Sequence, residues 1–113
     1  MRFTLRIDDT VARITVHGDI DYQTLPTLRS AAAGLPPHVT ELLWDLRDAR
    51  FMDVAGLHLL FEPRSQEGTT RKTTVTNLRP QPLRLLVLAA EANPALELAD
   101  LLPDTPQDTL LDD

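Results

Sequence analysis

Residues 42–60 read LLWDLRDARFMDVAGLHLL, and this stretch predicts a buried strand that leads into a helix. The segment at 39–46 is apolar at its centre and too short for an average helix, which favours a strand covered on both faces. From Ala55 the apolar residues recur at helical spacing, and we expect this helix to run to Gly68, with Pro63 weakening its last turn. A strand flanked by helices indicates a parallel component in the sheet.

The turn between this strand and this helix combines a capping residue with a costly glycine. Asp53 is placed to cap the helix, because its carboxylate can accept the free N–H groups of the first turn, worth about 1 kcal/mol. Gly56 inside the helix costs roughly 1 kcal/mol relative to alanine. Close approach of another backbone would explain it, and packing of the helix on a neighbouring strand is the alternative. Val54 and Ala55 stand between the two, where a regulatory loop more often carries hydroxyl groups.

The chain before this stretch predicts a hairpin and a helix. Residues 2–8 alternate strictly, which predicts a half-buried strand with Phe3, Leu5 and Ile7 on its apolar side. Residues 11–18 alternate as well, and the two-residue connection between the segments favours an antiparallel hairpin. The next segment predicts a helix with a cap at Thr24, a proline in its first turn at Pro26 and a terminating glycine at Gly34. Its apolar residues recur at helical spacing, at Leu25, Leu28, Ala32 and Leu35.

The chain after this stretch predicts a further strand and helix, followed by an ambiguous end. Residues 71–78 are rich in β-branched side chains and favour a strand, and Pro82 opens a helix that ends near Asn93. Beyond it, Leu96 and Leu98 fit a short last strand. The remaining apolar residues fit helix fragments interrupted by Pro103 and Pro106, and they are Leu101, Leu102, Leu110 and Leu111.

These elements predict an α/β fold with a mixed β-sheet, in which a mostly parallel core carries an N-terminal antiparallel hairpin and has helices packed on it. The length of 113 residues is that of one domain. We expect this domain to span residues 1–102. Residues 103–113 are then an acidic C-terminal tail, for which a frayed helix is one alternative.

Composition and charge exclude several classes of function. The net charge of -6 weighs against nucleic-acid binding, because that affinity comes from clustered Lys and Arg. The absence of cysteine excludes disulfides and thiolate metal sites. No apolar run approaches the roughly 20 residues of a membrane span, and the N-terminus lacks the apolar core of a signal peptide. We therefore expect no membrane insertion and a cytoplasmic location.

The sequence offers no pattern typical of a catalytic or metal site. His17, His38 and His58 lie far apart, without the spacing of metal ligands. Phosphate-binding glycine loops and nucleophile elbows are also missing as motifs. We expect no catalytic residues, no metal and no cofactor, and hence a protein that is not an enzyme.

Three blocks of sequence occur in a fixed order along the chain. ITVHGDIDYQTLPTL at 14–28 is an apolar strand followed by Gly18, Ile20 and Asp21, the opening stretch at 42–60 is the second block, and TVTNLRPQPLRLLVL at 74–88 is the third. Together they resemble the STAS domain, the fold of bacterial anti-sigma factor antagonists that also occurs in the tails of sulfate transporters. The resemblance implies a protein-binding module that performs no chemistry of its own.

In that family the antagonist binds a GHKL-type serine kinase that is also the anti-sigma factor, and this partner switching releases the sigma factor. Phosphorylation of a Ser or Thr directly after the motif Asp breaks the contact. The resemblance places Val54 at the phosphoacceptor position, and Ala55 after it also lacks a hydroxyl. We therefore expect a module that is not phosphorylated at this site.

The resemblance also implies which residues meet the partner, and it leaves two other roles open. One is an accessory STAS subunit of a lipid-transporting ABC system, which docks on the cytoplasmic ATPase. The other is a degenerate STAS module that only forms a homodimer, by burying Val54 against its own copy. The implied partner-binding residues are Asp21, Asp53, Val54, Ala55, Gly56, Leu57 and His58.

Overall fold

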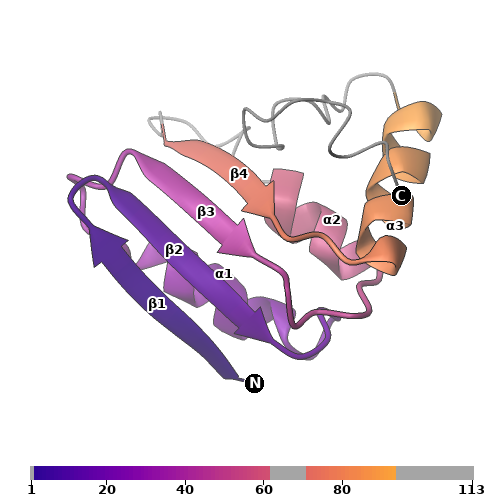
Figure 1. The fold of residues 1–113 in the computed structure, drawn as a ribbon, viewed down its shortest axis with the longest axis horizontal. Helices are drawn as coiled ribbons and strands as arrows, with labels where there is room; N and C mark the ends of the chain where they lie inside the picture. The colour runs from indigo at the N-terminus through magenta and orange to yellow at the C-terminus, as the bar shows by residue number, and fades with distance from the viewer. Residues whose placement is uncertain (1, 62–70, 94–113) are drawn as a thin grey trace.

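The computed structural model describes residues 2–61 and 71–93, which form one sheet with helices beside it (Figure 1). The predicted order of strands and helices is confirmed over these ranges. In chain order the elements are β1 (Arg2–Asp8), β2 (Val11–His17), α1 (Leu25–Ala33), β3 (Glu41–Asp45), α2 (Val54–Phe61), β4 (Lys72–Thr76) and α3 (Pro80–Ala92).

The sheet has the predicted mixed character. Its described strands lie in the order β1-β2-β3-β4. β1 pairs with β2 in an antiparallel hairpin, and β2 with β3 and β3 with β4 are parallel. Helices α1 and α2 lie together behind the sheet in the view of Figure 1, and α3 stands beyond β4. All parallel strands therefore end at the same edge of the sheet, where the loops that follow them meet.

The core lies between the sheet and the helices behind it. Alternate residues of β2, from Ala12 through Ile14 to Val16, are completely buried, as the alternating sequence predicts. Trp44 of β3 pairs in register with Ile14 and is also completely buried. Apolar side chains from both helices close this core, including Leu25, Leu28, Ala55, Leu59 and Leu60.

The prediction for the first strand is wrong in one respect. Phe3 is partly buried against the core, but Leu5 and Ile7 are each 41% exposed, so β1 is not half-buried along its length. The reason is strand order: β1 pairs only with β2 among the described strands, so it forms an edge of the sheet that the helices do not cover. Alternation in a sequence identifies a strand but does not tell where in the sheet it lies.

Several boundaries differ slightly from the predicted ones. α2 begins at Val54, one residue earlier than expected, and α3 begins at Pro80. Thr24 stands at the N-cap of α1 as predicted, but its side chain makes no capping hydrogen bond there. The predicted end of the second helix at Gly68, the elements proposed after residue 94 and the domain boundary after residue 102 lie outside the described residues.

No helix within the described ranges is long and apolar enough to cross a membrane.

Candidate functional site

Two loops meet at the edge of the sheet where the parallel strands end. The backbone of Ile20, in the loop after β2, bridges in parallel to Met52, in the loop before α2. The Ile20 N–H donates to the Phe51 carbonyl at 3.1 Å, and the Asp53 N–H donates to the Ile20 carbonyl at 3.1 Å. We call the surface formed by residues 19–22 and 51–58 the α2 corner. Its two halves are joined by backbone hydrogen bonds.

Met52 anchors the α2 corner to the rest of the domain. Its N–H donates to the Gln81 Oε1 atom at 2.9 Å, and its carbonyl accepts from Gln81 Nε2 at 3.0 Å, so one side chain of α3 satisfies both backbone groups. The Met52 side chain is completely buried. A Cβ atom at Gly56 would fall inside that side chain. The glycine is therefore explained by the close approach of the Met52 side chain, whereas the sequence suggested the close approach of another backbone.

Asp53 caps α2 as the sequence predicted. The Ala55 N–H donates to Asp53 Oδ1 at 2.8 Å, and the Gly56 N–H donates to the Asp53 carbonyl at 2.9 Å. The carboxylate therefore satisfies a free N–H of the first turn and lies at the positive end of the helix dipole. This cap fixes Val54 in the first turn of the helix, with half of its side chain (50%) exposed to solvent.

The exposed side of the α2 corner carries more apolar surface than the sequence indicated. Tyr22 is 63% exposed and Phe51 is 46% exposed, and each lies within two residues of the Ile20–Met52 bridge that joins the two loops. With Val54 they are three exposed apolar or aromatic side chains within the residues of the α2 corner. Sequence reasoning did not assign Tyr22 and Phe51 to the binding surface. An aromatic residue directly after Asp21 could have indicated Tyr22.

The other predicted binding residues fall into two groups. Asp21 is partly exposed, and its Oδ1 accepts the N–H groups of Gln23 and Thr24, both at 3.0 Å, so it orders its own loop. His58 is exposed. Ala55, Gly56 and Leu57 differ from these: the first two are buried and the third is partly buried against the core, so Ala55 and Gly56 shape the α2 corner without presenting surface of their own.

A buried carboxylate lies at the same edge of the sheet. Asp45 at the end of β3 is 1% exposed, and it accepts hydrogen bonds from Asn77 Nδ2 at 3.0 Å and from Arg47 Nε at 3.0 Å. Burial alone would raise the pKa of Asp45, but the hydrogen bonds from Asn77 and Arg47 outweigh burial and hold this pKa below its ordinary value. The contact joins the end of β3 to the residue after β4, where Asn77 adopts a left-handed backbone with φ of 58°.

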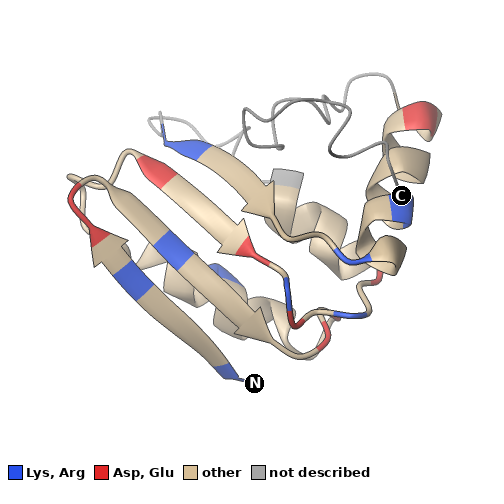
Figure 2. Cartoon of the chain, viewed as in Figure 1, with Lys and Arg blue, Asp and Glu red and all other residues tan. Residues whose placement is uncertain are grey.

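A second polar contact joins the loop after β3 to the hairpin of β1 and β2. His17 Nε2 lies 2.8 Å from Thr4 Oγ1, and His17 Nδ1 lies 2.9 Å from Asp48 Oδ2. No sequence motif indicates this link, because its members come from three separate segments. Charged residues alternate in sign along this connection (Figure 2), at Asp45, Arg47, Asp48, Arg50 and Asp53. Within the described ranges, no cluster of three or more His, Asp or Glu side chains is arranged to hold a metal ion.

Comparison with solved structures shows that this arrangement of strands and helices occurs elsewhere. An anti-sigma factor antagonist from Mycobacterium paratuberculosis superimposes with a TM-score of 0.71 at 24% identity, covering 98% of this chain and 92% of that one. The anti-sigma factor antagonist SpoIIAA in its unphosphorylated form gives 0.69 at 19% identity, with 98% and 94% covered. The Bacillus cell fate determinant SpoIIAA in its phosphorylated form gives 0.66 at 20% identity, with 98% and 97% covered.

Comparison of sequences gives a narrower result. The search of curated proteins finds no significant match. The STAS domain family, by contrast, matches residues 2–93, which include all the described strands and helices and both loops of the α2 corner. With the fold in agreement as well, the chain belongs to the STAS domain family.

Proposed function

We propose that this chain is a non-enzymatic binding module of the anti-sigma factor antagonist kind, which meets its partner through the α2 corner. The observation that carries the proposal is the position of Val54. It is half-exposed in the first turn of α2, yet the backbone around it is held by the Asp53 cap and by the contact of Gly56 with Met52. A fixed apolar group at the surface suits protein binding, because little conformational entropy is lost when it is covered.

The neighbours of Val54 support the same role. Tyr22 and Phe51 supply exposed aromatic area, and aromatic residues are enriched among those that dominate binding energy. Asp21 and Asp53 are partly exposed and directly precede Tyr22 and Val54 in the chain, and charged groups beside an apolar contact contribute mainly to orientation and to the rate of association. A partner that fits this surface has an apolar pocket bordered by basic or hydrogen-bond-donating groups.

We further propose that the partner is a GHKL-type serine kinase that is also an anti-sigma factor, in a cytoplasmic partner-switching pathway. The proposal rests on membership of the STAS family and on the likeness in fold to anti-sigma factor antagonists. Phosphorylation at the position of Val54 would add about -1.5 to -2 charges beside Asp53 and disrupt a closely packed contact. Val54 has no hydroxyl, so we expect binding that the kinase cannot reverse at this residue.

Replacement of Val54 by Asp tests the binding surface. A charge in the middle of an apolar contact is left without water or a partner, and we expect affinity for the kinase encoded nearby to fall by a factor of about 10 or more. Leu88→Asp is the matched control, because Leu88 is 55% exposed in α3 and lies outside the α2 corner. Equal affinity of the Val54→Asp variant and the unaltered chain, measured by isothermal titration calorimetry, would refute the proposal.

The same reagents separate this proposal from the alternatives. A module that serves a lipid-transporting ABC system would bind the ATPase subunit of that system and leave the kinase unbound. A module that only dimerises through Val54 would bind neither, and Val54→Asp would convert it to a monomer. Either result would contradict the kinase-binding role while leaving membership of the family intact.

A further inference from the structure

The strand β1 leaves an apolar row uncovered on the helix side of the sheet. Phe3, Leu5 and Ile7 are in register with Val16, Ile14 and Ala12 of β2, so they share the face that carries the core. Leu5 and Ile7 are nonetheless each 41% exposed. This row belongs to β1, which contributes no residue to the α2 corner, and the proposed binding to a kinase does not use it.

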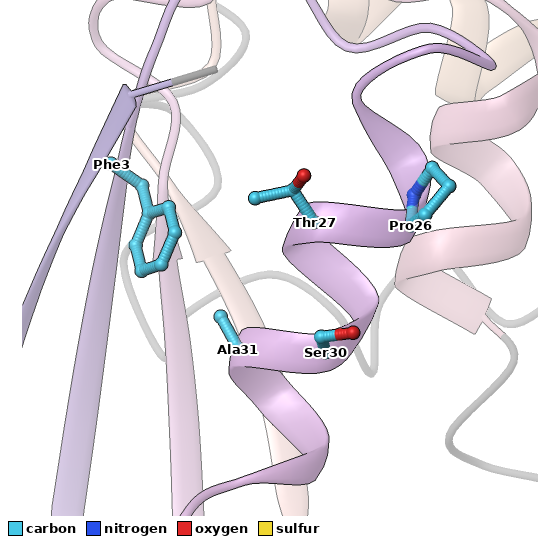
Figure 3. A pocket seen from close by; sticks show the side chains of 5 residues that line it. All are labelled: Phe3, Pro26, Thr27, Ser30 and Ala31. Atoms are coloured by element: carbon cyan, nitrogen blue, oxygen red, sulfur yellow. The ribbon is translucent and has the colours of Figure 1, made fainter.

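The space beside this row continues into a shallow groove against α1. Figure 3 shows the ring of Phe3 facing the helix, with the groove between them lined by Phe3, Pro26, Thr27, Ser30 and Ala31. The helical part of this lining consists of small side chains. The small side chains on the helical side leave this groove open next to Phe3.

Among the described strands β1 pairs only with β2, so its outer edge has no strand partner there. All seven residues of β1 are matched one to one with β2, without a bulge, and the strand contains no proline. An unbroken edge strand presents a row of unpaired N–H and C=O groups with which another chain can pair. The hairpin closes with a two-residue loop between Asp8 and Val11, and these two flanking residues form a hydrogen-bonded pair. Hydrogen-bonded pairs alternate along an antiparallel ladder, so the even residues of β1 bond to β2 and the odd residues direct their N–H and C=O groups outward.

We propose that this edge pairs with β1 of a second copy of the chain, antiparallel and centred on Leu5, so that the four described strands of each copy join in one continuous sheet. In this register Leu5 stands opposite Leu5 of the other copy, and Phe3 stands opposite Ile7. These are the odd residues, whose backbone groups point outward, so the ladder is hydrogen-bonded at each of them. Ile7 of the second copy comes to lie beside Phe3, at the groove on α1.

The charged residues of β1 favour this register, and they favour a second copy of the same chain as the partner. On the opposite face of the sheet the register places Arg2 against Asp8 of the other copy, once at each end of the seven-residue ladder. Sliding one copy by two residues shortens the ladder and places either Arg2 against Arg6 or Arg6 against its own equivalent. The sequence of β1, RFTLRID, is therefore complementary to itself in one antiparallel alignment.

A cysteine placed at Leu5 tests the register directly, because the chain has no cysteine of its own. Opposite residues in a hydrogen-bonded antiparallel pair have Cα atoms about 5.5 Å apart, which is within the range that a disulfide bridges. We expect Leu5→Cys to form a covalent dimer under mild oxidation and Val54→Cys, equally exposed, to remain monomeric. Preferential cross-linking of Val54→Cys would overturn the proposal in favour of a dimer through the α2 corner.

Light scattering and sedimentation of the full chain test the dimer itself. We expect a concentration-dependent dimer that Leu5→Lys converts to a monomer with an unchanged circular dichroism spectrum, since Leu5 lies outside the buried core. The single changes Arg2→Asp and Asp8→Arg should each weaken the dimer, and the combined swap should restore it. A chain that stays monomeric at millimolar concentration, or a swap that fails to restore the dimer, would refute the register. Binding of the kinase should persist in the Leu5→Lys variant, which separates this test from that of the α2 corner.

Discussion

Gln81 of α3 holds both backbone groups of Met52, at 2.9 and 3.0 Å, across a separation of 29 residues. Replacement by Leu should remove both bonds and leave the Met52 N–H and carbonyl without these partners, at a cost of about 1–3 kcal/mol in the free energy of unfolding. Gln81→Glu is the matched variant: its carboxylate can accept from the N–H but cannot donate to the carbonyl, so we expect an intermediate loss. Urea denaturation followed by the fluorescence of Trp44, the only tryptophan, provides the measurement. Equal stability of all three proteins would show that the hydrogen bonds between Gln81 and Met52 do not contribute to the free energy of unfolding.

Gly56→Ala should destabilise the domain although alanine is the better helix former by about 1 kcal/mol. The added methyl group would overlap the side chain of Met52, which is completely buried, so that side chain would have to shift within the core. We expect a net loss of about 1–3 kcal/mol, typical of an overpacked core. In the background of Met52→Ala the same change should cost less, and this non-additivity in a double-mutant cycle is the measurement. Strictly additive effects would show that the two residues do not compete for space.

Asp45→Asn should lower stability in a pH-dependent way. The pKa of Asp45 is held below its ordinary value of 3.8 by the hydrogen bonds from Asn77 and Arg47. A carboxyl group with a lowered pKa in the folded state contributes stability above its unfolded-state pKa, and this contribution is lost as the pH falls through the folded-state pKa. We expect a loss of about 1–3 kcal/mol at neutral pH that shrinks once the pH drops below the ordinary value. Denaturation midpoints measured across acidic and neutral pH test this.

Asp19→Asn is the control for that series, since Asp19 is an exposed aspartate of the α2 corner. A substitution at such a surface position should change the free energy of unfolding by less than about 0.5 kcal/mol. If Asp45→Asn were as mild as this control, the buried carboxylate would have no part in holding the ends of β3 and β4 together.

Val54→Thr should create a phosphorylation site where the chain has none. Its side chain is half-exposed in the first turn of α2, so a hydroxyl at this position is accessible to the kinase. Incubation with kinase and ATP should add one phosphoryl group, detected by mass spectrometry, and the product should bind the kinase more weakly. Ala55→Ser is the matched control, because residue 55 is completely buried and its hydroxyl would be hidden. Phosphate on the unaltered chain at Thr24 would contradict the expectation that the kinase does not regulate this chain by phosphorylation.

The mixed sheet and its order of elements could be predicted because each strand and helix carries its own local signal. Asp53 is the best example: a capping residue acts on the N–H groups two positions away, so sequence alone is sufficient to assign it. The exposure of Leu5 and Ile7 could not be predicted, because alternation is the same in an edge strand and in a central one. Strand order decides exposure, and strand order is a property of the whole sheet.

The details of the α2 corner were less predictable for the same reason. The glycine at 56 was identified as costly, but its cause lies in a side chain that reaches the helix from the preceding loop. The link from Gln81 to Met52 joins residues that no short motif contains. The loops that carry Tyr22 and Phe51 are bonded to each other through Ile20, and no periodicity in the sequence indicates this.

The parallel bridge between Ile20 and Met52 also constrains how this domain can change in evolution. Because each loop is bonded to the other on both sides of the bridge, a residue inserted into one loop would shift its partner out of alignment. The lengths of the two connections are therefore expected to vary together among relatives, or not at all. The segment at 34–40, which joins α1 to β3, lies outside the bridge, so insertions there would leave the α2 corner in place.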